Sequence, residues 1–190
     1  MSFRSALLAA LAMAWVAGCS SGPPTRFYTL TDTAPEATAP AGVGLVQVAG
    51  VTVPGELDRP ELVRRIGPNQ LSISGLDRWA APLDQTIRRV LSDDMSRRVP
   101  TPVPGREYPV SVDIHEFYGD ASCNVILRAV WTVRASHAEA SRPVNEEIRV
   151  PSSGACPGTL AATMSVALGQ LSDRIIAGVA RLPAPPDHEP

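Results

Sequence analysis

The stretch Pro82–Arg98, PLDQTIRRVLSDDMSRR, carries a clear helical pattern. Its large apolar residues recur at helical spacing and therefore fall on one face of a helix: Leu83, Ile87, Val90, Leu91 and Met95. Arginine and aspartate residues occupy the opposite face, and Pro82 suits a first helical turn. We predict an amphipathic helix, which must bury its apolar face against another layer of the fold.

Strand patterns and a second helix follow. Tyr108–Tyr118 alternates apolar and polar residues, Asn124–Val133 is apolar on both faces like a central strand, and Val144–Val150 is a further strand. Thr159–Leu182 repeats the helical pattern, with an apolar stripe at Leu160, Met164, Leu168, Leu171, Ile175, Val179 and Leu182.

Shorter strands are predicted upstream, at Phe27–Leu30, Val43–Val53 and Gln70–Ser74. Leu57–Ile66 is ambiguous, because it fits either a helical turn that begins at Pro60 or an extended edge strand. The predicted fold class is α/β (α+β): a mainly antiparallel sheet with two amphipathic helices packed on it.

The N-terminus predicts export and lipidation. A single arginine precedes Ala6–Val16, an apolar run that is too short to span a bilayer but suits a secretory signal peptide. Val16-Ala17-Gly18-Cys19 then resembles a bacterial lipobox, with Val16 as a mild departure. That resemblance implies a thioether-linked diacylglycerol and an N-acyl chain on Cys19, which together would hold the protein on a membrane. Ser20 after the cysteine favours the outer membrane by analogy with lipoprotein sorting.

Length and composition complete the domain plan. The 190 residues suit one domain: a signal peptide at 1–18, a lipidated tether at 19–26, a single α/β domain at 27–182 and a disordered proline-rich tail at 183–190. The net charge of -2 argues against a nucleic-acid partner. All 17 basic residues are arginine, which excludes a Schiff-base lysine and a phosphate-loop lysine.

Two cysteines remain after Cys19, namely Cys123 and Cys156, and an oxidising periplasm favours a disulfide between them. If the strands at 124–133 and 144–150 form an antiparallel hairpin, the numbers of paired residues add to about 278. The two cysteines fit that register within about one position, at the open end of the hairpin. Two buried free thiols are the alternative, and a zinc site is not supported, since no close cysteine pair or nearby histidine accompanies them.

Catalytic constellations are few. Ser111, Asp113 and His115 alternate on one predicted strand, but side chains two residues apart point the same way without lining up as a catalytic triad. Acidic residues lie among many arginines and are better explained as surface charge than as a cation site. We therefore expect no catalytic residues, no metal and no cofactor beyond the lipid on Cys19.

Three phrases carry a family resemblance: GPPTRFYTL at Gly22–Leu30, VTVPGELDRPELVRR at Val51–Arg65, and RWAAPLDQTIRRV at Arg78–Val90. Together they resemble the PqiC (YmbA) family of auxiliary lipoproteins for ABC-type transport. The resemblance implies a non-enzymatic lipoprotein on the periplasmic face of the outer membrane, linked to lipid transport and membrane integrity. It also implies an inner-membrane MCE-domain partner, PqiB-like, and a homo-oligomeric ring.

Docking on such a partner needs surface rather than catalytic groups. Candidates for partner or ring contact come from the second and third phrases: Pro54, Leu57, Asp58, Arg59, Arg78 and Trp79. Trp79 and Leu83 fit equally well as local caps on the core. One alternative function is a stand-alone periplasmic lipoprotein that binds a lipid or small ligand, which requires a deep apolar cavity. Another is an envelope hydrolase, which requires a nucleophile with a partnered base.

Overall fold

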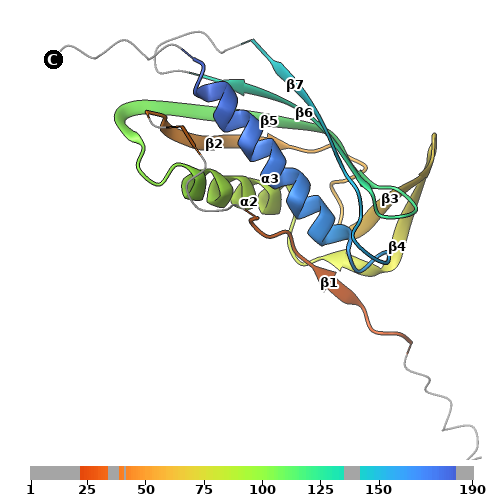
Figure 1. Ribbon diagram of the computed structural model, residues 1–190. Coiled ribbons are helices and arrows are strands. Elements are labelled where there is room, and N and C mark those ends of the chain that lie inside the picture. The colour runs from red at the N-terminus through yellow and green to blue at the C-terminus, as the bar shows by residue number, and fades with distance from the viewer. Residues whose placement is uncertain (1–21, 34–38, 41, 135–141, 183–190) are drawn as a thin grey trace, which may run out of the picture.

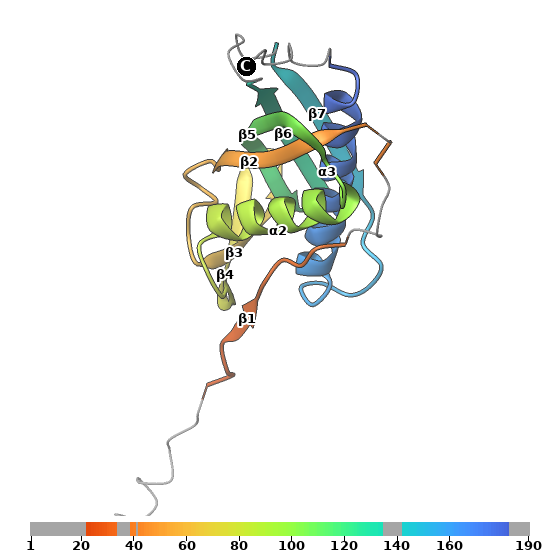
Figure 2. The same ribbon diagram turned by 90° about the vertical axis from the view of Figure 1, so that its left-hand side faces the viewer.

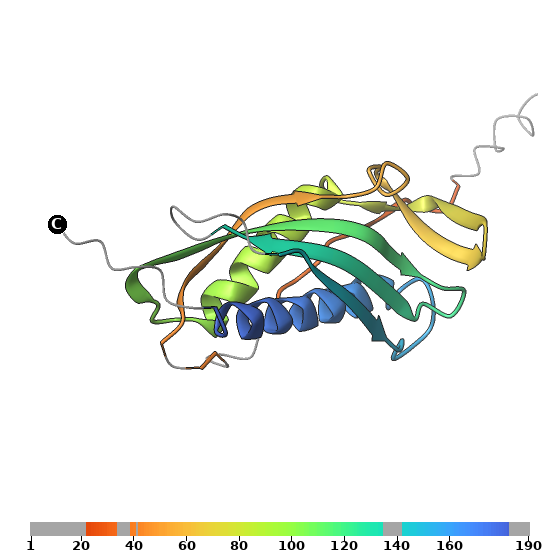
Figure 3. The same cartoon turned by 90° about the horizontal axis from the view of Figure 1, so that it is seen from above.

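A mixed sheet with helices on one face organises the chain (Figures 1 and 3). The computed structural model describes residues 22–33, 39–40, 42–134 and 142–182. Helices α2 (Leu83–Arg98) and α3 (Leu160–Val179) confirm the two predicted helices, and α3 ends three residues before Leu182. Among the described helices, none combines the length and apolar character that a membrane crossing requires.

The sheet has seven strands in the order β1-β4-β3-β5-β6-β7, and β2 also pairs with β5. β3–β4, β5–β6 and β6–β7 pair antiparallel, whereas β1–β4 and β2–β5 pair parallel. The predicted, mainly antiparallel sheet is thereby confirmed. The strand bounds are β1 Arg26–Tyr28, β2 Gly44–Thr52, β3 Glu61–Gly67, β4 Gln70–Trp79, β5 Val103–Gly119, β6 Val125–Val133 and β7 Val144–Val150.

The core lies between the sheet and the helices, and the predicted periodicities fill it. In α2, all five predicted apolar positions are buried, and α3 buries its predicted stripe from Leu160 to Val179. Val110, Val112 and Ile114 of β5 face them at 0%, 2% and 1% exposure. Figure 2 shows α2 lying across the front of the strands, with α3 running at a steep angle to it beside β7. Burial of these side chains is the main stabilising contribution to the fold.

One prediction about strands is decided in favour of its extended alternative, and a second needs correction. Leu57–Ile66 contains no helical turn from Pro60, because Glu61–Gly67 pairs with β4 as strand β3. Asn124–Val133 is a central strand, but only one of its faces is fully buried. Its outer face carries the exposed Arg128 and half-buried neighbours, because both described helices pack on the opposite side of the sheet.

The register of the β6–β7 hairpin also differs from its prediction. Val125 pairs with Val150, three positions earlier on β7 than the expected register. The centre of the loop between β6 and β7 therefore lies earlier in the chain than predicted. Residues 135–141 within that loop lie outside the described residues, as do 1–21 and 183–190, which contain the predicted signal peptide, the first three residues of the tether and the tail.

Candidate interaction site

The six predicted contact residues meet at one corner of the molecule. The β2–β3 loop turns at Pro54, whose carbonyl accepts hydrogen bonds from the amides of Leu57 and Asp58 at 2.9 and 3.1 Å. The loop then runs beside the end of β4, where the Trp79 amide donates to the Pro60 carbonyl at 2.7 Å. Segments about twenty residues apart in sequence therefore form a single corner.

A surface hollow of about 330 Å³ lies in this corner. Proline, alanine and tryptophan side chains line it, with Asp58 and Arg59 beside them: Pro60, Trp79, Ala80, Ala81 and Pro82. Leu57 and Trp79 are themselves buried, at 3% and 6% exposure, so they support the corner from the core and offer a partner little surface. The exposed members that a partner would meet are Asp58 and the two arginines, Arg59 and Arg78.

One carboxylate holds both arginines of the corner. Glu61 accepts a hydrogen bond from Arg59 Nε at 3.1 Å and lies 3.7 Å from Arg78 Nη2. The hydrogen bond from Arg59 is the main cause that lowers the pKa of Glu61 below its ordinary value. The corner thus presents two cations fixed by one anion, a rim suited to electrostatic recognition of a partner.

A second polar group borders the corner and was not anticipated. The Tyr118 hydroxyl donates to Glu56 Oε1 at 2.8 Å, and the Arg65 guanidinium stacks 4.7 Å from the Tyr118 ring centre. Burial, with the hydrogen bond to Glu56 next in size, raises the pKa of Tyr118 to about 12. Only the contact between β3 and the end of β5 brings these residues together, so no local sequence pattern could have revealed them.

The N-terminal segment is fastened to the domain over residues 26–33. β1 pairs in parallel with the end of β4, and Arg26 forms an ion pair with Asp77 at 2.7 Å. The chain then crosses both helices. The carbonyl of the fully buried Leu30 accepts a hydrogen bond from Arg89 on α2 at 2.8 Å. The Thr31 amide donates to Ser165 on α3 at 3.1 Å. The predicted attachment residue Cys19 lies outside the described residues, but the chain that follows it enters the fold here.

A buried ion pair lies beneath this crossing. Arg98 of α2 is 2% exposed and lies 3.2 Å from the fully buried Asp94. The same guanidinium reaches α3, donating to Asp173 at 2.6 Å and to the Gly169 carbonyl at 2.9 Å. Asp94 also accepts from the Thr33 amide at 3.1 Å, so the cluster ties both helices to the N-terminal segment.

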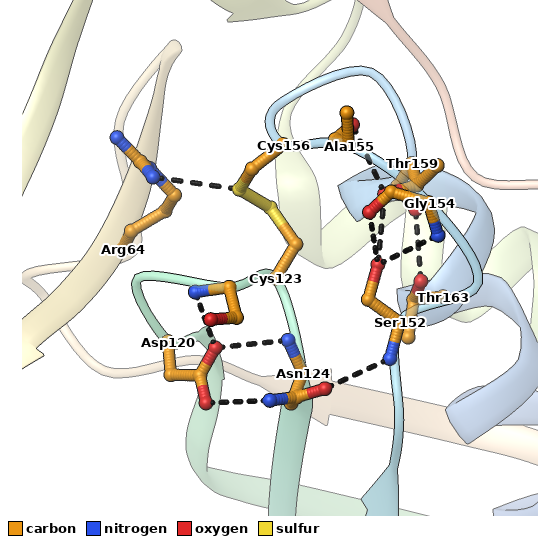
Figure 4. The surroundings of a disulfide bond; sticks show 11 residues. Arg64, Asp120, Cys123, Asn124, Ser152, Gly154, Ala155, Cys156, Thr159 and Thr163 are labelled. Atoms are coloured by element: carbon orange, nitrogen blue, oxygen red, sulfur yellow. Dashed lines mark hydrogen bonds between the residues drawn. A yellow bond between two sulfur atoms is a disulfide. The ribbon is translucent and has the colours of Figure 1, made fainter.

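The structure joins Cys123 and Cys156 in the predicted disulfide, with their Cα atoms 5.5 Å apart (Figure 4). The bridge connects the turn before β6 to the loop between β7 and α3. Around it, the Asn124 side chain links two loops, donating to Asp120 at 2.9 Å and accepting from the Ser152 amide at 3.0 Å. Arg64 of β3 lies 3.4 Å from the Cys156 sulfur. The disulfide therefore closes the end of the sheet that carries β3 and β4.

Charged side chains alternate across the face of the sheet that the helices leave open. They form a chain of ion pairs over β3, β5, β6 and β7, at 3.5, 3.3, 2.9 and 2.7 Å: Arg65, Glu116, Arg128, Glu147 and Arg149. Hydrogen bonds from Arg149 and then Arg128 lower the pKa of Glu147. Such exposed pairs contribute little stability one by one. They keep this face polar and covered with fixed charge.

The residues that suggested a triad form an exposed pair instead. His115 Nε2 lies 3.0 Å from Asp113 Oδ2, with both side chains more than half exposed. A β-bulge at His115 breaks the regular alternation and brings this histidine beside Asp113. Asp113 also accepts from the Thr52 hydroxyl, the main cause that lowers its pKa. Within the described ranges, no cluster of three or more potential ligand side chains could hold a metal ion.

Comparison with known proteins gives a consistent result. The sequence model of the family described as the ABC-type transport auxiliary lipoprotein component matches residues 28–176. The curated intermembrane transport lipoproteins PqiC of Escherichia coli strain K12 and of Shigella flexneri are each 29% identical over 149 residues. Those alignments cover 74% of this chain and 80% of each relative.

Two crystal structures share the fold. One, of an uncharacterised protein, has a TM-score of 0.66 at 21% identity and covers 83% of this chain and 99% of its own. The other, from Xanthomonas campestris, has a TM-score of 0.64 at 17% identity and covers 79% of this chain and 92% of its own. At these identities the similarity concerns the fold alone.

Proposed function

The chain belongs to the family of ABC-type transport auxiliary lipoprotein components, and we propose that it is the outer-membrane lipoprotein of an MCE-type, Pqi-like envelope transport system. In this proposal, diacylglycerol and an N-acyl chain on Cys19 hold it on the periplasmic face of the outer membrane. Its folded domain, assembled as a homo-oligomeric ring, docks the tunnel of an inner-membrane MCE-domain protein. The system moves lipids and maintains membrane integrity.

The observation that carries this proposal is the family match over residues 28–176, which spans nearly all of the described fold. The identity to two lipoproteins named for intermembrane transport supports the same class of system. The surface hollows at the corner and beside Tyr118, about 330 and 380 Å³, are lined in part by charged side chains. They lend no support to a stand-alone carrier, which requires an apolar cavity for its ligand.

The geometry of the N-terminus supports an anchored role. Three backbone pairs join β1 to the end of β4, and the residues beyond β1 are hydrogen-bonded to both helices. A pull on the tether would therefore be carried by the folded domain instead of unravelling its first residues. The docking corner begins on the same part of β4, at Arg78 and Trp79.

Cys19→Ser tests the anchor. Without the thiol no diacylglycerol can be attached, so the variant should leave the outer-membrane fraction and appear in the soluble periplasm. Ser20→Ala is the matched control, since it leaves the thiol in place, and it should fractionate like the wild type. A Cys19→Ser variant that still sediments with the outer membrane would contradict the anchor.

Charge reversal tests the docking corner. Arg59→Glu with Arg78→Glu places two further carboxylates beside Glu61 and should weaken binding of the purified MCE-domain protein by about tenfold or more. Arg149→Glu reverses the charge of an exposed arginine on β7, away from the corner, and should bind like the wild type. Equal binding by all three proteins would remove the corner from the interface, and equal weakening by both variants would show a general charge effect.

A further inference from the structure

The hairpin of β3 and β4 extends beyond the rest of the sheet. β3 meets β5 through the single pair Arg64↔Gly119, and β1 reaches β4 only at residues 77–79. Residues 66–73, here called the hairpin tip, therefore pair only within the β3–β4 hairpin. Figures 1 and 3 show the hairpin on the side of the molecule away from the C-terminal end of α3, and in Figure 1 the tip points up whereas β1 lies below, at the other end of β4.

The hairpin tip exposes large apolar side chains on either side of the exposed polar residues Asn69 and Gln70. Its large side chains Ile66, Leu71 and Ile73 are 43%, 37% and 48% exposed, and Phe27 of the adjoining β1 is 66% exposed. In the described part of the chain, the other large apolar side chain of comparable exposure is Val166 on α3, at 40%. Single exposed apolar residues need no explanation, but this grouping on one projection marks a surface that contacts something apolar.

The tether brings a bilayer within reach of this projection. From Cys19 to Arg26 the extended chain spans at most about 25 Å. Arg26 pairs with Asp77, and the six residues of β4 from Asp77 to Leu71 span about 20 Å. A membrane that holds acyl chains on Cys19 therefore lies close enough for the hairpin tip to touch it.

We propose that the hairpin tip rests in the phospholipid interface of the bilayer to which the chain is anchored, with Ile66, Leu71 and Ile73 entering the boundary of the acyl chains. This inference rests on the lipid anchor of the proposed function. Residues 62–73 contain two arginines and no carboxylate, although Glu116 of β5 pairs with one of them, Arg65. Apolar side chains flanked by arginine suit an interface with anionic headgroups.

The consequence for the molecule is a fixed orientation. An acyl anchor alone permits rotation about the tether, whereas a second contact through the hairpin tip holds the domain at one angle to the bilayer. The contact can be weak, because tethering makes it intramolecular and raises the effective concentration of membrane at the tip.

Bromine quenching of tryptophan fluorescence tests the contact. The full-length acylated protein is reconstituted into vesicles of phosphatidylethanolamine and phosphatidylglycerol, with and without brominated acyl chains. Leu71→Trp places a probe on the hairpin tip, and Val166→Trp is the matched control, since the two native side chains are similarly exposed. Trp79 and Trp131 are buried in the wild type, and their signal is subtracted. If Leu71→Trp fails to fold, Ile73→Trp replaces it.

The expected result is quenching of the added Leu71→Trp fluorescence by about twofold, with no change for Val166→Trp. Equal quenching at the two positions, or none at position 71 in a protein that floats with the vesicles, would overturn the membrane contact and leave the anchor intact. Fluorescence that shifts with protein density but not with bromine would indicate that the tip contacts a second copy of the chain. That result would also overturn the membrane contact. Failure of the wild-type protein to float would refute the anchor, and with it both proposals.

Discussion

Reduction of the Cys123–Cys156 disulfide should cost a large part of the stability of the domain. The bridge spans 33 positions of sequence and closes a loop that contains both β6 and β7. Loop-closure entropy for that length gives about 3.7 kcal/mol at 25 °C. This corresponds to a change of about 500-fold in the unfolding equilibrium constant. With a urea m-value of about 2 kcal/mol/M, the unfolding midpoint should fall by about 2 M.

The assay is urea unfolding of the mature chain, followed by circular dichroism, with and without a phosphine reductant. The sequence has 3 cysteines, so a Cys19→Ser background leaves the two cysteines of the bridge as the only groups that the reductant can act on. The Cys123→Ala/Cys156→Ala variant controls for direct effects of the reductant and should show none. If reduction moves the wild-type midpoint by less than about 0.5 M, loop closure is not what the bridge contributes and the entropic reasoning is wrong.

Three further predictions concern the interior and its charges. Arg98→Met removes the cation beside buried Asp94 and should lower the free energy of unfolding by about 3–5 kcal/mol, measured in the same urea assay. Gly169→Ala should destabilise the protein despite favouring the helix, because an added Cβ would collide with the Thr33 hydroxyl; in a Thr33→Ala background the same change should be neutral or stabilising. Burial raises the pKa of Asp77, but hydrogen bonds from Ser74 and Arg26 outweigh it and lower that pKa overall. Its contribution to stability is therefore present above its ordinary pKa and is lost as the pH falls through the lower folded value, so Asp77→Asn should flatten the acid side of a stability–pH profile.

The elements that the sequence predicted well depend on local periodicity. Pro82–Arg98 and Thr159–Leu182 alternate between core and solvent at helical spacing, and burial of one face is enough to specify a helix. Tyr108–Tyr118 was identified for the same reason, with a strand period, although β5 begins earlier, at Val103. The disulfide was predicted from the oxidising compartment and from an approximate strand register. That prediction held although the register of the β6–β7 hairpin was in error by three positions.

The elements that escaped prediction depend on partners distant in sequence. The predicted strand Gln70–Ser74 continues to Trp79 in β4, because Glu61 pairs with Arg78 and Arg26 pairs with Asp77. Those pairings are not encoded in any local pattern, since Gly75 and Asp77 interrupt the apolar alternation. The contact of Tyr118 with Glu56 and the buried Arg98 cluster arise in the same way. Asp94 was assigned to the polar face of its helix, but the structure buries it completely beside Arg98 and Ser172 of α3.

The arrangement around β4 connects anchor, corner and hairpin tip in a single strand. Its first residues form the hairpin tip, Asp77 holds β1 and hence the tether, and Arg78 and Trp79 open the corner. A paired strand is stiff along its length. The distance between a membrane contact at one end of β4 and a docking surface at the other is therefore the length of about ten strand residues, or about 30 Å. In the proposed function, β4 would thus set the height at which a partner meets the domain above the bilayer. Lengthening the tether would leave that height unchanged as long as the hairpin tip stays in the bilayer. Replacing Ile66, Leu71 and Ile73 by serine would remove the tip contact, so the height would then depend on the length of the tether alone.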